Sequence, residues 1–260
     1  MPKFSANLTM LFNEVDFLDR FEKAAKVGFK GVEYLFPYAW KKEELRERLD
    51  RYGLVQVLHN LPPGDWQAGE RGIACLPGRE GEFQDGVGKA IEYAKTLGCP
   101  RLNCLVGKRP SGMAPDKVRR TLIENLRFAA GALEREGIRL LIEPLNDQDL
   151  PGFYLVHTRD ALQLMEEVGH PNLFLQYDIY HMQIMEGNLT KTITGHLSKI
   201  GHIQLADVPG RHEPGTGEIN FPNLFRFLDE AGYEGWMGCE YIPSGNTEEG
   251  LKWIEPYLQS

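Results

Sequence analysis

Four short apolar segments of the 260-residue chain end in a side chain with an oxygen that could bind a metal. These side chains are Glu143 in LLIEP, Asp178 in FLQYD, Gln204 in GHIQLAD and Glu240 in MGCEY. Three carboxylates in one partly buried cavity would repel one another and lose hydration at considerable cost. A divalent cation relieves this, and oxygen ligands favour a hard ion such as Mg²⁺ or Mn²⁺ over zinc. The pattern predicts a metal site. The alternative is that each side chain binds only the amides of its own loop.

The same residues could carry out proton transfer next to a carbonyl group. A cation that binds two oxygens of a hydroxy-carbonyl compound stabilises the enediolate that forms when a neighbouring proton is removed. The proton must then return to the adjacent carbon, and a pair of carboxyl groups is suited to this task. We assign the task to Glu143 and Glu240, which are three strands apart in the predicted fold and could reach opposite sides of a substrate.

Glycine residues mark the elements that must position these side chains. The chain has 28 of them, an excess over the roughly 7% of an average protein. Seven stand where an amphipathic run ends and a short apolar run begins: Gly28, Gly53, Gly98, Gly137, Gly169, Gly201 and Gly232. A glycine just past a helix adopts the left-handed conformation without a side-chain clash. We interpret all seven as helix ends, each followed by a buried strand.

A further strand near residues 4–8 completes eight strands that alternate with eight helices. Alternation predicts a parallel sheet, and eight units in this length predict a closed (β/α)₈ TIM barrel. The phosphate-binding turn of an open doubly wound sheet, GxGxxG, is absent. We find no linker, and therefore expect residues 1–260 to form a single domain. Active sites of such barrels lie at the C-terminal ends of the strands, where the four oxygen-bearing residues stand.

Composition excludes several classes of function. With 29 basic and 37 acidic side chains, the net charge is -8, which argues against a nucleic-acid partner. No apolar run is long enough to span a membrane, and the first residues lack the pattern of a secretion signal. The four cysteines show no metal-ligand spacing and are expected to be buried thiols. We therefore expect a cytoplasmic protein, and leave open whether it forms a homo-oligomer through its barrel helices.

Residues 61–81 have almost no periodicity and contain Trp66, Arg71 and Arg79. Structureless segments of this length are uncommon unless they serve a function. We interpret this one as a loop that covers the barrel mouth and helps to exclude water, with its substrate contacts unassigned. The alternative is a packed surface excursion.

Five segments together resemble the hydroxypyruvate isomerase family: residues 59–80, 142–153, 174–190, 202–221 and 238–241. The similarity extends over nearly the whole chain. That family belongs to the xylose-isomerase-like barrels, alongside ketose 3-epimerases and endonuclease IV. The resemblance implies interconversion of hydroxypyruvate and tartronate semialdehyde through an enediol. It places the family's metal ligands at Glu143, Asp178, Gln204 and Glu240, and its proton donor and acceptor at Glu143 and Glu240.

The resemblance also implies residues that contact the substrate. His181 matches the histidine of a DxxH pattern, and Arg211 matches a substrate-binding arginine of the wider superfamily. A small anionic substrate needs a cation, and arginine binds carboxylates through two hydrogen bonds. Lys108, at the end of CLVGK, is a second candidate for this role. The alternatives are a capping or core histidine and solvated loop charges. We do not expect His212 or Glu218 to touch the substrate.

Other functions stay open at this point. Relatives of this family isomerise 2-oxo-tetronate, which is one carbon longer, by the same chemistry. Gln204 stands where many superfamily members have histidine, so zinc chemistry is not implied, and the segment EPLNDQD leaves the roles of Asn146 and Asp149 open. An endonuclease-like barrel would need several zinc-binding histidines and a basic groove, which seven histidines and a charge of -8 do not favour. A barrel that only binds a sugar acid would not need Glu143 and Glu240.

Overall fold

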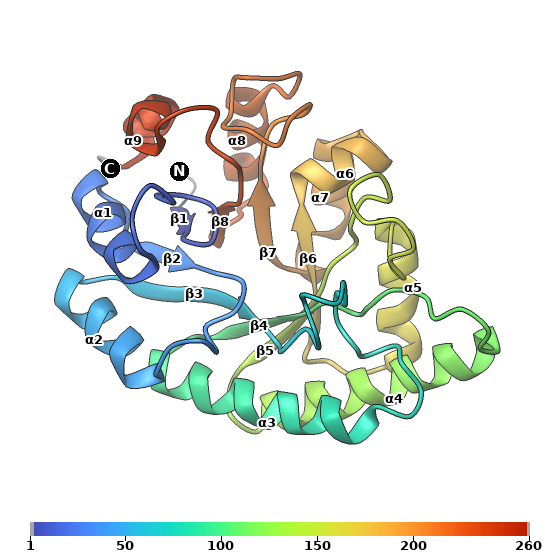
Figure 1. The fold of residues 1–260 in the computed structure, drawn as a ribbon. Coiled ribbons are helices and arrows are strands. Elements are labelled where there is room, and N and C mark those ends of the chain that lie inside the picture. Colours follow the sequence, from blue (N-terminus) through green and yellow to red (C-terminus); the bar gives the residue numbers. More distant parts are fainter. Residues whose placement is uncertain (1–2, 259–260) are drawn as a thin grey trace.

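The computed structural model describes residues 3–258, and its sheet is a closed barrel of parallel strands (Figure 1). Each strand pairs with the next along the chain, and the first pairs with the last. The strands are β1 (Lys3–Asn7), β2 (Gly31–Glu33), β3 (Val55–Asn60), β4 (Arg101–Cys104), β5 (Arg139–Ile142), β6 (Leu173–Asp178), β7 (Ile200–Leu205) and β8 (Trp236–Cys239). The predicted TIM barrel is therefore confirmed.

Helices follow every strand and surround the barrel (Figure 1). The main ones are α1 (Arg20–Val27), α2 (Lys42–Tyr52), α3 (Glu80–Leu97), α4 (Pro115–Glu134), α5 (Thr158–Val168), α6 (Ile179–Met185), α7 (Leu189–His196), α8 (Phe221–Glu230), α9 (Thr247–Gly250) and α10 (Glu255–Leu258). Two connections depart from the predicted single helix, because β6 is followed by both α6 and α7, and β8 by α9, a 3₁₀ turn and α10. Among residues 3–258, no helix is long and apolar enough to cross a bilayer.

Six of the seven glycines that predicted helix ends have that role. Gly28, Gly53, Gly98 and Gly169 cap α1, α2, α3 and α5 in the left-handed conformation. Gly137 and Gly232 also have positive φ, in the turns that follow α4 and α8. The glycine pattern predicted the βα repeat because each strand must start immediately after a helix has ended.

Gly201 was wrongly interpreted as a helix end. It lies inside β7, where the preceding helical segment ends at Lys199 without a left-handed residue. A Cβ atom at position 201 would approach Leu141 Cδ2 to 2.5 Å and Phe174 Cβ to 2.9 Å. The glycine is needed there because side chains from β5 and β6 fill the space beside β7.

A fully buried carboxylate lies inside the barrel, at the end of β2. Glu33 accepts a hydrogen bond from Ser5 Oγ at 2.8 Å, and its Oε2 lies 2.9 Å from His202 Nε2. Burial alone would raise its pKa, but His202 and the hydrogen bonds hold the pKa of Glu33 below its usual value. Glu33 is therefore an ionised structural group, since burying a charge is tolerable only when it is paired and hydrogen-bonded.

Gly238 of β8 makes room for this carboxylate. A Cβ atom at that position would approach Glu33 Oε1 to 2.2 Å and Oε2 to 2.5 Å. The carboxylate cannot move aside, because its partners on β1 and β7 hold it in place.

We therefore expect Gly238→Ala to lower the free energy of unfolding by about 1–3 kcal/mol, the usual cost of overpacking a core. Chemical denaturation of the purified variant measures this. Gly245→Ala is the matched control, because a Cβ atom at that exposed glycine would meet nothing within 4 Å. Equal stabilities of the two variants would contradict the tight packing of Gly238 against Glu33.

Candidate active site

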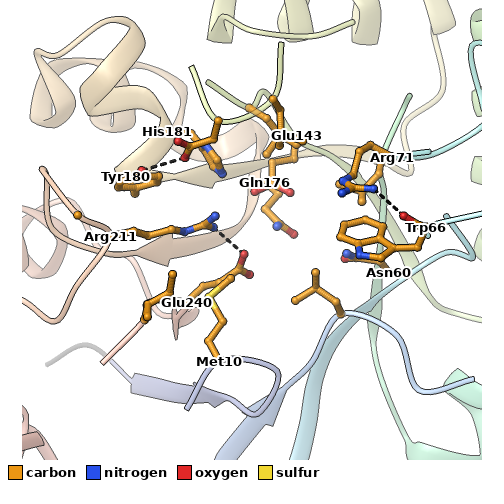
Figure 2. Close-up of a pocket in the computed structure, with 17 residues that line it drawn as sticks. Met10, Asn60, Trp66, Arg71, Glu143, Gln176, Tyr180, His181, Arg211 and Glu240 are labelled. Atoms are coloured by element: carbon orange, nitrogen blue, oxygen red, sulfur yellow. Dashed lines mark hydrogen bonds and ion pairs between the residues drawn. The ribbon is translucent and has the colours of Figure 1, made fainter. Parts of the chain in front are cut away.

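The four oxygen-bearing side chains all lie at the C-terminal ends of strands, and two of them, Glu143 and Glu240, line one cavity. Asp178 and Gln204 are not among the described residues of its lining, but they bond to Arg211 and Glu240, which are. Glu143 follows β5, Asp178 ends β6, Gln204 lies in β7 and Glu240 follows β8. The cavity has a volume of about 610 Å³, within the range of small-molecule sites. Its polar lining consists of Asn60, Trp66, Arg71, Glu143, Asp149, Gln176, Tyr180, His181, Arg211 and Glu240 (Figure 2). Leucines, Met10, Gly210 and Ile242 complete the wall.

Glu240 is held by three donors. Arg211 donates to its Oε1 at 2.8 Å, while Asn7 Nδ2 at 2.9 Å and Gln204 Nε2 at 2.5 Å donate to its Oε2. Burial nevertheless raises the pKa of Glu240 to about 8, against the opposing effect of Arg211 and with the help of Asp178. The protonated form of this carboxyl group is therefore favoured more than in an exposed glutamate.

Gln204 connects the site to the barrel interior. Its Nε2 also donates to Glu33 Oε1 at 2.7 Å, and its Oε1 accepts from Gln176 Nε2 at 2.7 Å. Both ends of the amide are thus engaged by protein atoms. The side chain is 1% exposed, so its orientation is determined by these contacts.

Glu143 faces the cavity from β5. Asn103 Nδ2, from the neighbouring strand β4, donates to its Oε2 at 2.8 Å. Burial raises the pKa of Glu143 well above its usual value, and the charges of Glu240 and Asp178 raise it further. Like Glu240, this group is suited to holding a proton that is later given up.

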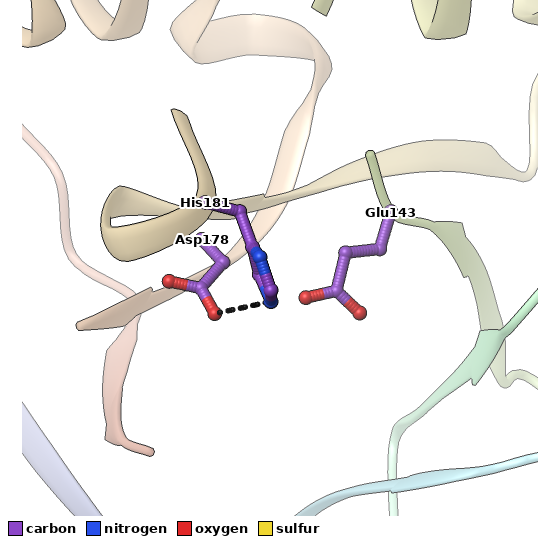
Figure 3. A group of neighbouring side chains, drawn as sticks. All are labelled: Glu143, Asp178 and His181. Atoms are coloured by element: carbon purple, nitrogen blue, oxygen red, sulfur yellow. Dashed lines mark ion pairs between the residues drawn. The ribbon is translucent and has the colours of Figure 1, made fainter. Parts of the chain in front are cut away.

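Asp178 and His181 lie beside Glu143, as Figure 3 shows. Ligand atoms of these three residues are all within 4.8 Å of one another. Burial raises the pKa of Asp178 to about 6, although its Oδ1 accepts the amide of Tyr180 at 2.8 Å. The carboxyl groups of Glu143 and Asp178 could hold a metal ion, with the ring of His181 beside them.

The proton of His181 can be placed from its contacts. Its Nδ1 accepts a hydrogen bond from the backbone amide of Asn146 at 3.1 Å, so that nitrogen carries no proton. Burial and the nearby Arg211 lower the pKa of His181 well below its usual value, which keeps the ring neutral. The proton is therefore on Nε2, which lies 3.6 Å from Asp178 Oδ2. His181 faces the cavity as a hydrogen-bond donor.

These residues fit a divalent cation. Three buried carboxyl groups with raised pKa values bind a cation in place of protons, since it removes their mutual repulsion. Gln176 Oε1 is buried at the same place and has no hydrogen-bond partner among the described residues. Glu143 and Asp178 are already close together, whereas Glu240 and Gln204 are bonded to each other and to neighbouring side chains.

Arg211 lies between two of the predicted metal ligands. Besides Glu240, it contacts Asp178 Oδ2 at 3.4 Å, and its guanidinium lies 4.9 Å from the ring centre of Tyr180. Its backbone has φ 57°, a conformation that costs energy for a residue other than glycine. The structure thus brings Arg211 into the site, but with its charge already compensated.

Lys108, the second predicted substrate-binding cation, does not line the cavity among the described residues. It forms an isolated β-bridge with Phe153. His212 and Glu218 are also outside the described lining. His212 Nδ1 lies 2.7 Å from the carbonyl oxygen of Ile242, and Glu218 accepts a hydrogen bond from Gln183.

The loop of residues 61–79 covers one side of the mouth, as expected. Trp66 and Arg71 line the cavity, whereas Arg79 forms ion pairs with Glu70 and Glu82 away from it. The covering role of this segment is therefore supported by the structure.

Sequence reasoning missed several residues of the lining. Gln176 stands two positions before Asp178 on β6, so alternation along the strand could have placed both on the same face. Tyr180, in α6, and Asp149, in the loop after β5, are joined by a hydrogen bond of 2.9 Å, and no sequence signal connects them. Asn146, whose role was left open, holds both His181 and Asp149.

Comparisons with known proteins agree with this geometry. The model of the xylose isomerase-like TIM barrel family matches residues 21–257. Hydroxypyruvate isomerase of Escherichia coli (strain K12) is 59% identical over 99% of this chain and 100% of its own. The 2-oxo-tetronate isomerase of Cupriavidus necator is 50% identical over 99% of both chains.

Solved structures show the same relationship. A Brucella melitensis protein named AP endonuclease, family 2 has a TM-score of 0.97 and 49% identity, with 99% of each chain covered. The 3-keto-D-glucoside 4-epimerase YcjR of E. coli shares the fold, with a TM-score of 0.77 and 21% identity over 98% of this chain and 99% of that one. The resemblance seen in the sequence is confirmed: the chain is an isomerase, like the relatives that match it over their full length, and it belongs to the xylose isomerase-like TIM barrel family.

Proposed function

We propose that this isomerase interconverts hydroxypyruvate and tartronate semialdehyde by proton transfer through an enediolate. The observation that carries the proposal is that two carboxyl groups, the buried Glu143 and the partly buried Glu240, face the same cavity from the ends of β5 and β8. The pKa of each is raised, so each can both take and return a proton. The two relatives with the names hydroxypyruvate and 2-oxo-tetronate isomerase support this substrate class.

The reaction needs one carbon-bound proton to move by one atom. One carboxylate removes a proton from the hydroxymethyl carbon of hydroxypyruvate, and the C–H electron pair forms the double bond of the enediolate. The other carboxyl group delivers a proton to the former carbonyl carbon, while the hydroxyl proton transfers between the two oxygens. No electrons are gained or lost overall. The roles of Glu143 and Glu240 exchange in the reverse reaction.

Other side chains orient the substrate and stabilise the negative charge that forms on its oxygens. His181 presents its Nε2 proton to the cavity and can donate to a substrate oxygen. Arg211 and Gln204 hold the carboxyl group of Glu240 in place. We propose Glu143, Asp178, Gln204 and Glu240 as ligands of Mg²⁺ or Mn²⁺, which when bound supplies positive charge to the oxygens of the enediolate.

The alternative substrate is 2-oxo-tetronate, which undergoes the same transfer with one more carbon. A DNA substrate has less support, because the charged residues of the lining are the acids Glu143, Asp149 and Glu240 as well as Arg71 and Arg211. A protein that only binds its ligand does not need two facing carboxyl groups with raised pKa values, so this function has less support.

We expect purified protein with Mg²⁺ or Mn²⁺ to convert hydroxypyruvate, with a higher kcat/KM than either enantiomer of 2-oxo-tetronate. The 59% identity to the hydroxypyruvate enzyme, against 50% for the other, is the basis of this order. Chelation should abolish turnover, and readdition of the metal should restore it. Absence of turnover with all three substrates and both metals would overturn the proposed function.

Glu240→Gln should lower kcat by about 10²–10⁴-fold, the usual contribution of a general acid or base. Glutamine keeps the shape and one acceptor oxygen, so the circular dichroism spectrum should change little. Glu234→Gln, an exposed glutamate shortly before β8, is the control with the same change of charge. Near-normal turnover of Glu240→Gln would show that the proton is transferred by another group.

The stability of the metal-free protein should depend on pH through Glu240. Folding raises its pKa to about 8, above the usual value for a glutamate, so the folded state binds the proton more tightly than the unfolded state. The contribution of this proton binding to the free energy of unfolding is fully present below pH 4.5 and is lost as pH rises to about 8. In Glu240→Gln the side chain at position 240 does not titrate, so this variant does not lose stability over that range.

Its free energy of unfolding relative to wild type should therefore rise across that range, as measured by urea denaturation at a series of pH values. A constant difference between the two proteins would mean that Glu240 is ionised throughout.

A further inference from the structure

Positive charge is distributed unevenly around the cavity. The proton-transferring acids Glu143 and Glu240 lie toward β5 and β8, and Arg211 lies beside Glu240. Figure 2 shows Arg71, Trp66 and Asn60 across the cavity from Arg211 and Glu240. An anionic substrate in this cavity therefore meets the paired Arg211 and Glu240 on one side and the guanidinium group of Arg71 on the other.

Arg211 is poorly placed to receive the carboxylate of a substrate. Its guanidinium already pairs with Glu240 at 2.8 Å and with Asp178 at 3.4 Å. A substrate carboxylate bound there would compete with these two carboxyl groups for the donors of the guanidinium, and it would be repelled by either of them when that group is ionised.

Arg71 differs from Arg211 in having no acidic partner. Within residues 3–258, no carboxylate lies at ion-pair distance from its guanidinium. The group lies 3.7 Å from the ring centre of Trp66, and one of its terminal nitrogens donates to the carbonyl oxygens of Trp66 at 3.1 Å and Glu70 at 2.7 Å. Stacking and these two bonds fix its orientation, while the remaining donors stay available.

The loop that carries Arg71 is anchored to the barrel. Gly72 donates to the carbonyl of Pro63 at 2.9 Å, and a Cβ atom at Gly72 would collide with the carbonyl oxygen of Leu105 just beyond β4. Cys75 donates to the carbonyl of Val106 at 2.9 Å. Trp66 packs edge-on against Phe36 beyond β2, with ring centres 5.0 Å apart. Arg71 is therefore held in position before any ligand arrives, which lowers the entropic cost of binding.

We propose that Arg71, stacked on Trp66, binds the carboxylate of the 2-oxo acid substrate. This inference rests on the proposed function and specifies how the substrate lies in the cavity. The carboxylate points toward residues 61–79, and the hydroxymethyl and carbonyl carbons point toward Glu143 and Glu240. Arginine suits this role because its planar group donates two parallel hydrogen bonds to a carboxylate.

The test compares Arg71→Met with wild type on two substrates that differ only at the recognised end. Hydroxypyruvate has a carboxylate, and dihydroxyacetone has an uncharged hydroxymethyl group in its place. We expect the KM for hydroxypyruvate to rise roughly 10- to 100-fold with a smaller change in kcat, as for the loss of charge-assisted hydrogen bonds used in ground-state binding. The preference for hydroxypyruvate over dihydroxyacetone in kcat/KM should fall by a similar factor.

Arg109→Met is the matched control. Arg109 also lies over an aromatic ring, 5.2 Å from the centre of Tyr154, but is exposed and outside the described lining. Its KM should equal that of wild type. Arg71→Lys keeps the charge and loses the two-pronged geometry, so its KM should lie between those of wild type and Arg71→Met.

Two failures can be told apart. In the first, wild type turns over hydroxypyruvate, and folded Arg71→Met or Arg71→Lys has the same KM and the same preference for hydroxypyruvate over dihydroxyacetone. This result would overturn the role of Arg71 alone. A wild-type enzyme that converts neither hydroxypyruvate nor 2-oxo-tetronate would overturn the proposed function and this inference together.

Discussion

The amide of Gln204 stands between two buried carboxylates, and the arrangement of the site depends on it. Its nitrogen donates to Glu33 on one side and Glu240 on the other. Asn7 Nδ2 also donates to both acids, at 3.4 Å to Glu33 and at 2.9 Å to Glu240, so two neutral amides separate an acid with a lowered pKa from an acid with a raised pKa. Without these donors, the carboxyl oxygens of Glu33 and Glu240 would face each other in a largely buried region with no group between them to compensate negative charge, which is costly.

This contact also explains why the two acids behave differently. Glu33 has a histidine and a serine as additional partners and remains ionised. Glu240 lies at the cavity, where Asp178 and burial oppose its ionisation more than Arg211 favours it. The same chemical group is therefore a structural anion inside the barrel and the proposed proton carrier at its mouth, and the distinction comes from the neighbours.

Much of the fold and part of the site followed from the sequence, for a physical reason. Helix ends and strand starts are local events, so glycines such as Gly28 and Gly169 marked the repeat, and the ends of the strands pointed to Glu143 and Glu240. Gly201 was misread because the local pattern does not show what lies beside a strand in space. The contacts of Arg211 with Asp178, and of Tyr180 with Asp149, could not be predicted, since each joins a loop residue to a residue of β6 or α6 that is distant in the sequence. The placement of Lys108 depended on where its loop turns after β4.

The anchoring of residues 61–79 has a consequence for how such an enzyme can change. The acids stand on strand ends, whose spacing is set by the closed sheet, whereas Arg71 stands on a loop attached at a few backbone points. A change in that loop alters the distance between the charge that receives the substrate and the groups that react, and leaves the barrel intact. The length of the accepted substrate can therefore change while the reaction stays the same. Related enzymes can thus share one reactive centre and act on different substrates.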